Sequence, residues 1–201
     1  MRRVPLLPDR TRPLFFAHRG CSSLAPENTL ASFRLARQLG SPGLELDIHR
    51  CASGELVVAH DDDFRRCAGS PLIIEEAEWK DIRGLDVGSH KGDEFSGERV
   101  PLIQDVLDEF SGTIYIDIEL KSRKSSGDEL PALLARILHS RSDAKRLASS
   151  ILVSSFNPLA LAAFKAQAPE FATRHNLARR WRIALVPASR PGALDFPLRL
   201  P

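Results

Sequence analysis

Histidine, arginine and acidic side chains follow two apolar runs of the chain. His18 and Arg19 come directly after Phe-Phe-Ala, and Gly20 follows them. His60 and Asp61 come after Leu-Val-Val-Ala in the same way. An apolar run that ends in polar residues is typical of a strand that ends at a functional loop. A histidine at each of two strand ends could act as general acid or general base at neutral pH.

Acidic residues occupy every second position in two further stretches. Glu45 and Asp47 alternate with leucine and isoleucine, and Asp117, Glu119 and Lys121 do the same. In a strand, this alternation puts all the polar side chains on one face. Carboxylates on an inner face are costly to bury unless they are paired or bind a cation. Glu45, Asp47 and Glu119 therefore indicate an oxygen-rich site for a hard cation such as Mg²⁺ or Ca²⁺.

Cationic side chains at the same strand ends suit an anionic substrate. Arg19 and Lys121 could neutralise such a substrate over the metal, and this combination with two histidines suits attack on a phosphate ester. No glycine-rich phosphate loop is present in the sequence, so a nucleotide-hydrolysing fold is not indicated. Two roles stay open for Glu27, which either orients Arg19 or stabilises its own loop. Asp61 either orients His60 or binds solvent.

Strands and helices alternate along the chain. Strands are predicted at residues 14–19, 43–48, 55–61, 113–121, 151–156 and 183–186. Helices are predicted at residues 30–39, with Asn28 as N-cap, and at residues 75–83, 101–110, 130–139 and 158–167. This order favours a parallel sheet closed into a barrel, in which the strand ends ring one mouth. A single domain is expected over residues 1–201, with a small insertion at about 62–100.

The composition is that of a globular chain and excludes several classes of partner. The 201 residues carry a net charge of +2, which is too balanced to argue for nucleic acid or an anionic membrane as partner. No apolar run is long enough to span a membrane. The three cysteines are odd in number and lack a paired metal spacing, which fits a reducing compartment. A cytoplasmic location without stable membrane insertion is therefore expected.

The ordered set of motifs over residues 14–168 resembles the glycerophosphodiester phosphodiesterase family. The matching pieces are His18-Arg19-Gly20, Pro26-Glu27-Asn28-Thr29, Glu45-Leu46-Asp47, Val57-Val58-Ala59-His60-Asp61, Leu85-Asp86-Val87-Gly88, Ile118-Glu119-Leu120-Lys121 and Ser155-Phe156. The resemblance implies a (β/α)₈ TIM barrel with a small insertion. It also implies hydrolysis of a small glycerophosphodiester to sn-glycerol 3-phosphate and an alcohol.

The same resemblance assigns roles to individual residues. A divalent metal, Mg²⁺ or Ca²⁺, would lie on Glu45, Asp47 and Glu119. His18 and His60 would form the acid/base pair. Arg19 and Lys121 would bind the phosphoryl group. Glu27 and Asp61 stay candidates for residues that support them, with the open roles given above.

The resemblance fades after Glu170. The family closes with a Trp-Thr-x-Asn motif, whereas Trp181 is followed here by Arg-Ile-Ala. Six candidate strands predict a barrel incomplete at its C-terminal end, whose opening a second copy of the chain could cover. Two alternative functions follow: a sphingomyelinase-D-like phospholipase, or a truncated inactive family member that acts as a binding protein. The first usually belongs to secreted chains with paired cysteines, and the complete catalytic set argues against the second.

Overall fold

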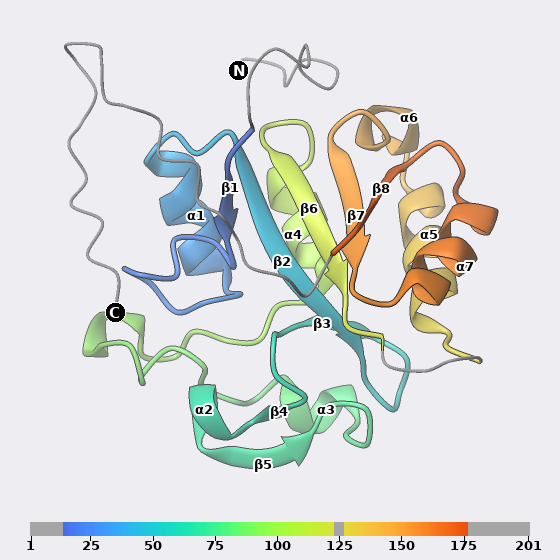
Figure 1. Cartoon of the computed structure of the whole chain (residues 1–201). Coiled ribbons are helices and arrows are strands. Elements are labelled where there is room, and N and C mark those ends of the chain that lie inside the picture. Colours follow the sequence, from blue (N-terminus) through green and yellow to red (C-terminus); the bar gives the residue numbers. More distant parts are fainter. Residues whose placement is uncertain (1–13, 123–126, 177–201) are drawn as a thin grey trace, which may run out of the picture.

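Five parallel strands form the centre of the structure, in the order β1–β2–β6–β7–β8 (Figure 1). This computed structural model describes residues 14–122 and 127–176. The strands are β1 Phe16–His18, β2 Gly43–Arg50, β6 Tyr115–Leu120, β7 Ile151–Ser155 and β8 Ala172–His175. The crossover helices are α1 Leu30–Gln38, α4 Ile103–Phe110, α5 Leu130–Ser140, α6 Ala144–Leu147 and α7 Pro158–Gln167. Because the strands are parallel, their carboxyl ends lie at one edge of the sheet.

Alternation along β2 and β6 separates an apolar face of the sheet from a charged one. Leu44 lies beside Ile116, and Asp47 lies beside Glu119, in the parallel register of the two strands. The apolar members belong to the main core, where Phe33 and Phe110 meet edge to face with ring centroids 6.1 Å apart. The acidic members therefore share the opposite face, as the sequence predicts.

The predicted helices form with small shifts at their ends. Helix α7 covers the predicted residues 158–167, and α5 extends one residue beyond its predicted end. The prediction of Asn28 as the N-cap of α1 is wrong. Thr29 caps this helix, since its hydroxyl oxygen accepts from the Ser32 amide at 3.3 Å. Asn28 instead has a left-handed backbone (φ 57°), and its side chain forms a hydrogen bond with Asp47.

The strand predicted at residues 55–61 is real in part, but its direction differs from that of a barrel strand. Strand β3, Leu56–Val58, pairs antiparallel with the end of β2, and Ile48 lies beside Val58. The turn at Ser53-Gly54 has a left-handed glycine (φ 101°) and is too short for a parallel crossover. The hairpin extends beyond the carboxyl ends of the parallel strands and then returns. His60, which follows β3, therefore lies close to those ends.

Residues 62–100, the insertion, form a small layer beyond the carboxyl ends of the strands (Figure 1). Their elements are β4 Asp63–Phe64, α2 Arg65–Ala68, β5 Ser70–Ile73, α3 Trp79–Ile82 and a 3₁₀ turn at Asp93–Phe95. The helix predicted at residues 75–83 is thus a single turn. A second apolar cluster, which includes Phe64, Ile74 and Ile82, joins the insertion to Val57 and Ala59. The division into one domain with an insertion stays a prediction.

Strand β8 has no counterpart in the sequence prediction, because Ala-Thr-Arg-His carries neither an apolar run nor clear alternation. The strand predicted at residues 183–186 lies outside the described residues. Closure of the barrel, and a second copy that covers an opening, therefore stay predictions. Over residues 14–122 and 127–176, no helix is long and apolar enough to cross a membrane.

Candidate active site

A cavity of about 220 Å³ opens at the carboxyl ends of the strands. All seven residues predicted to bind metal, to bind phosphate or to transfer protons line it, together with Phe156, Arg174 and Asn176. They come from the middle of β2, from the ends of β1, β6 and β8, and from the loops that follow β3 and β7. The topology thus brings together side chains up to 158 positions apart, which span His18 to Asn176.

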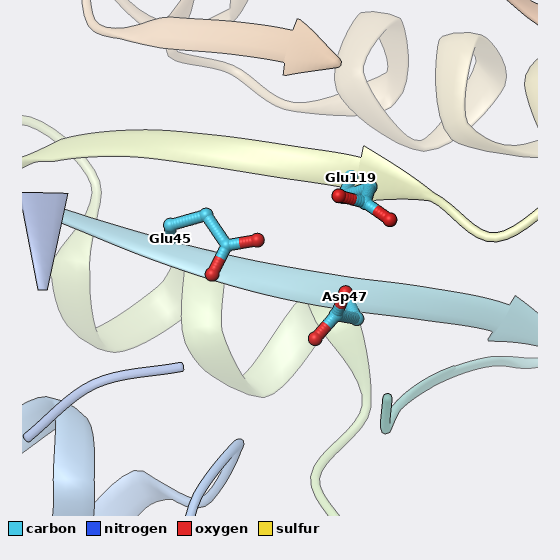
Figure 2. Close-up of side chains that lie close together, drawn as sticks. All are labelled: Glu45, Asp47 and Glu119. Carbon is cyan, nitrogen blue, oxygen red and sulfur yellow. The ribbon is translucent and has the colours of Figure 1, made fainter. Parts of the chain in front are cut away.

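Three carboxylates converge in this cavity (Figure 2). Glu45 and Asp47 lie on β2 and Glu119 on β6, and one oxygen of each lies within 4.8 Å of the others. All three are buried, with exposed fractions of 8%, 1% and 8%. Burial, followed by the charge of Asp47, raises the pKa of Glu45 to about 8. A buried carboxyl group that resists ionisation beside two further carboxylates fits a site for a divalent cation, whose charge would offset the repulsion.

Two cationic side chains lie beside the carboxylates. Lys121 donates through Nζ to Glu119 Oε1 at 3.0 Å and lies 3.4 Å from Asp47 Oδ1. Arg19 donates its backbone N–H to Glu45 Oε2 at 3.0 Å, and its Nε lies 3.4 Å from Asp47 Oδ2. The backbone of Arg19 is left-handed (φ 57°), an uncommon conformation for a residue with a side chain. That turn at the end of β1 places its amide against Glu45.

Two asparagines that sequence reasoning missed hold the carboxylates in place. Asn28 donates through Nδ2 to Asp47 Oδ2 at 2.9 Å, and its Oδ1 accepts from the Asp47 amide at 3.3 Å. Asn176 donates through Nδ2 to Glu119 Oε2 at 3.0 Å. Partners of this kind orient metal ligands. The Pro-Glu-Asn-Thr motif drew attention to Asn28 but suggested a helix cap, whereas Asn176 follows a strand that has no sequence signal.

The two histidines line the cavity from separate segments. His18 is the last residue of β1, and His60 lies in the loop that follows β3. His60 forms a hydrogen bond of 2.7 Å between Nδ1 and Asp61 Oδ1. Since a carboxylate only accepts, Nδ1 carries the proton, and Nε2 is left for a substrate. His18 Nε2 lies 3.9 Å from Glu45 Oε2, and 64% of the His18 side chain is exposed. Partial desolvation in the concave mouth, and then the charge of Arg19, lower the pKa of His18.

Residues whose roles the sequence left open now have partners. Glu27 Oε1 accepts from Arg19 Nη1 at 3.1 Å, so it contacts Arg19 directly. Asp117 is buried behind the triad, where Ser154 Oγ donates to it at 2.7 Å and Arg174 Nη2 at 2.8 Å. Burial raises the pKa of Asp117 to about 6. Lys121, on the same face, contacts Glu119 and Asp47.

The strand predicted at residues 43–48 is two residues longer in the structure, which places His49 inside it. Strand β2 runs on to Arg50, and His49 is 2% exposed, with Nε2 3.2 Å from the carbonyl oxygen of His60. Burial lowers the pKa of His49, which favours its neutral form. His49 thus supports the backbone of His60 and does not line the cavity.

Comparison with known proteins places this chain in a family. The sequence profile of the glycerophosphoryl diester phosphodiesterase family matches residues 18–185. A glycerophosphodiester phosphodiesterase of Caldanaerobacter subterraneus subsp. tengcongensis is 31% identical over 179 residues, which are 87% of this chain and 72% of the relative. A glycerophosphodiester phosphodiesterase of Bacillus subtilis is 29% identical over 165 residues, 76% of this chain and 54% of the relative.

A solved structure shows the same arrangement of elements. The Oleispira antarctica phosphodiesterase, in complex with the product sn-glycerol-3-phosphate, has a TM-score of 0.73 and 34% sequence identity. The match covers 82% of this chain and 66% of that one, so the chain spans just under two thirds of this structural neighbour and about half of the Bacillus relative. The parallel α/β fold is therefore of the TIM-barrel type of these enzymes. From the profile match and these likenesses, the chain belongs to the glycerophosphoryl diester phosphodiesterase family.

Proposed function

We propose that the chain hydrolyses glycerophosphodiesters to sn-glycerol 3-phosphate and an alcohol in a divalent-metal-dependent reaction. The observation that carries this proposal is the cavity in which three buried carboxylates meet two cations and two histidines. The named product in the Oleispira antarctica complex supports the same substrate class. The substrate is a small molecule, and the cavity of about 220 Å³ has room for a phosphoryl group with its glycerol.

Glu45, Asp47 and Glu119 would hold the cation, either Mg²⁺ or Ca²⁺. Their oxygens are hard ligands, and the two asparagines fix the orientation of Asp47 and Glu119. A bound divalent cation would supply Lewis-acid polarisation of a phosphoryl oxygen. Arg19 and Lys121, which already contact the carboxylates, would neutralise the remaining charge of the phosphodiester.

His18 and His60 would move the protons. One imidazole accepts a proton from the attacking oxygen, which forms a new bond to phosphorus. The other donates a proton to the alcohol oxygen as its bond to phosphorus breaks, so no net proton is lost by the pair. The attacking oxygen belongs either to water or to the 2-hydroxyl of the substrate glycerol, and in the second case a later water molecule completes the hydrolysis.

A direct assay tests this proposal. The purified chain is incubated with glycerophosphocholine and Mg²⁺ or Ca²⁺, and phosphorus NMR follows the release of sn-glycerol 3-phosphate. Release with metal and none with a chelator is the expected result. Turnover of sphingomyelin or lysophosphatidylcholine in its place would point to a sphingomyelinase-D-like phospholipase. If no diester is cleaved although the triad binds metal, the binding-protein alternative gains and the proposed hydrolysis is wrong.

Two further parts of the proposal concern organisation and location. The whole chain, residues 1–201, acts as one barrel domain in which residues 62–100 are an insertion near the mouth. The cytoplasm is the proposed location, because Cys21, Cys51 and Cys67 are all free. Limited proteolysis of the purified chain would test the first point, and fractionation of the source cells would test the second.

A further inference from the structure

A chain of ion pairs joins the insertion to both sides of the cavity. Arg66, on helix α2, donates through Nη1 to Glu27 Oε2 at 2.8 Å and through Nη2 to Glu27 Oε1 at 2.7 Å. Its Nε donates to Asp61 Oδ2 at 2.8 Å. Glu27 in turn accepts from Arg19, and Asp61 accepts from His60. The Arg66 guanidinium is thus linked through Glu27 to Arg19, a predicted phosphate-binding residue. It is linked through Asp61 to His60, a predicted proton-transfer group.

All three nitrogens of the Arg66 guanidinium donate a hydrogen bond to a carboxylate. The planar fork of arginine meets both oxygens of Glu27, and the remaining Nε–H reaches Asp61. Asp61 divides its two oxygens, with Oδ2 for Arg66 and Oδ1 for His60. A carboxylate held at both ends cannot rotate freely, so the imidazole that it binds keeps one orientation.

The electrostatics agree with this geometry. Burial would raise the pKa of Asp61, but its hydrogen bonds from Arg66 and His60 outweigh burial and lower that pKa. In the same way the charges of Arg66 and Arg19 outweigh the burial of Glu27 and lower its pKa. Both carboxylates therefore stay ionised beside an acidic cavity, because Arg66 offsets their charge.

We propose that Arg66 is a positioning residue for the reaction: through Asp61 it sets the orientation and tautomer of His60, and through Glu27 it sets the placement of Arg19. This inference rests on the proposed function for its kinetic consequences. The role does not require Arg66 to touch the substrate, and Arg66 does not line the cavity that holds the triad. It also gives the insertion a part in catalysis, because the residue belongs to α2.

Loss of Arg66 would have two effects, one through Asp61 and one through Glu27. Asp61 would be free to turn Oδ1 away from His60, which lowers kcat because the imidazole is presented in fewer productive orientations. Glu27 would keep Arg19 but lose its neutralising partner, so it would hold Arg19 more strongly and away from a phosphoryl group, which raises KM. Removal of partners that orient active-site groups typically costs about 10- to 100-fold in activity.

A neighbouring arginine supplies a matched control. Arg65 lies on the same helix, is more exposed than Arg66, and pairs with Asp63 of the insertion instead of the groups near the cavity. The variants Arg66→Gln and Arg65→Gln remove the same charge one residue apart. We expect Arg66→Gln to lower kcat about 10-fold or more and to raise KM, and Arg65→Gln to change neither. Equal melting temperatures of the two variants would exclude a general loss of folding.

Two measurements separate positioning from a merely structural contact. In an Asp61→Asn background, Arg66→Gln should lower kcat by much less than it does alone, because the link through Asp61 is already broken. Nitrogen NMR of the His60 ring, which needs no substrate, should show the Nδ1–H tautomer in the wild type and in Arg65→Gln, and a mixture in Arg66→Gln. Arg66→Lys should rescue only part of kcat, since one ammonium cannot reproduce the fork.

The outcomes distinguish this inference from the proposed function. If the wild type cleaves glycerophosphocholine and Arg66→Gln equals Arg65→Gln in kcat, KM and the His60 spectrum, the positioning role is wrong while the function stands. If the wild type cleaves no diester but only Arg66→Gln alters the His60 tautomer, the positioning of His60 stands and the reaction is wrong. Fully additive effects of Asp61→Asn and Arg66→Gln would also overturn the route through Asp61.

Discussion

Charge balance at the level of single residues favours a cation in this cavity. The three carboxylates face Arg19 and Lys121, whereas Arg174 is paired with the buried Asp117. With all three carboxylates ionised, the site would hold one uncompensated negative charge and would repel a phosphodiester anion. Burial and the charge of Asp47, which raise the pKa of Glu45 to about 8, oppose that state in the absence of a cation. A divalent cation would reverse that sign and leave one positive charge for the substrate. Metal binding and substrate binding should consequently be coupled in the wild-type chain.

The first prediction concerns the metal ligands. Glu119→Gln removes one charged ligand while it keeps nearly the same side-chain shape, so it should weaken Mg²⁺ or Ca²⁺ binding and turnover together. Isothermal titration calorimetry of the metal-free variant measures metal affinity, and the glycerophosphocholine assay measures turnover. Glu170→Gln is the matched control, because Glu170 pairs with His139 on the surface. Unchanged metal affinity in single Glu45, Asp47 and Glu119 variants would show that the ion lies elsewhere.

The second prediction concerns the histidine pair. His18→Ala and His60→Ala should each lower kcat by roughly 10² to 10⁴, since each removes a proposed proton-transfer group while the proposed metal ligands stay in place. His139→Ala, at an exposed ion pair with Glu170, should leave kcat unchanged. Stopped assays at saturating substrate give the comparison. Turnover of His60→Ala close to that of the wild type, with an intact fold, would contradict its role.

The site residues that could be predicted from the sequence are those that share a face of a strand or follow an apolar run. Glu45, Asp47 and Glu119 obey strand alternation, and His18 and His60 follow apolar runs. The asparagines could not be predicted in their roles, because their contacts span 19 and 57 residues and depend on how loops close over the sheet. Asparagine is a common helix cap, so the sequence suggested that role for Asn28. In the structure its backbone is left-handed and its side chain points to Asp47.

At the level of elements, the prediction held where periodicity was strong and missed what depends on connection length. Strand β6 and helix α7 have clear patterns and lie where they were expected. Strand β3 was read from its apolar residues alone, although the short turn at Ser53-Gly54 already required an antiparallel hairpin. Strand β8 is polar and short, and it is stabilised by its pairing with β7. Its existence follows from the sheet and not from its own residues.

The third prediction tests the connection between β1 and α1. Gly20 has φ 78°, and an added Cβ would lie against the Ser32 hydroxyl and 2.8 Å from the Ser32 carbonyl carbon. Gly40 has nearly the same φ, 81°, but open space around it. Gly40→Ala should therefore cost only the backbone penalty, roughly 1–2 kcal/mol of the free energy of unfolding. Gly20→Ala should cost more and should also lower activity, because it displaces the neighbouring Arg19 amide from Glu45.

Chemical denaturation of both glycine variants gives the comparison, with turnover measured where each variant is fully folded. The shared backbone conformation cancels in the difference between them, so the excess reports the contact of the β1 loop with α1. Equal stabilities, or full activity of folded Gly20→Ala, would mean that the loop adapts without moving Arg19.

At the scale of the whole molecule, the buried charges of the proposed metal site also bear on stability. The acidic face of the sheet is covered by side chains of β1, β8 and the loop that follows β3, so the carboxylates are desolvated in the fold but hydrated in the unfolded chain. Ionisation of Glu45 is thus a cost of folding that a bound cation would offset. A ligand that binds only the folded state raises its stability by mass action.

The last prediction follows from that linkage. In the metal-free protein the pKa of Glu45 is raised to about 8, whereas an unfolded glutamate ionises near its ordinary value. Between these values the folded state holds the proton that the unfolded state has lost, so the free energy of unfolding falls as pH rises. The pKa of Asp117, raised to about 6, acts in the same direction at lower pH.

His18 and His49 act in the opposite direction, because their pKa values are lowered in the folded state. Their effect is complete once the unfolded histidines are neutral, above about pH 7. Between about pH 7 and pH 8.5 the melting temperature of the wild type in a chelator should therefore fall, and the decline should be much smaller in Glu45→Gln. Saturating Mg²⁺ or Ca²⁺ should remove the decline in the wild type, since the ion binds ionised Glu45 and binds it more tightly as pH rises. Differential scanning calorimetry across this range decides the matter: a metal-free wild type whose melting temperature is level or rises would show that Glu45 is already ionised without a cation.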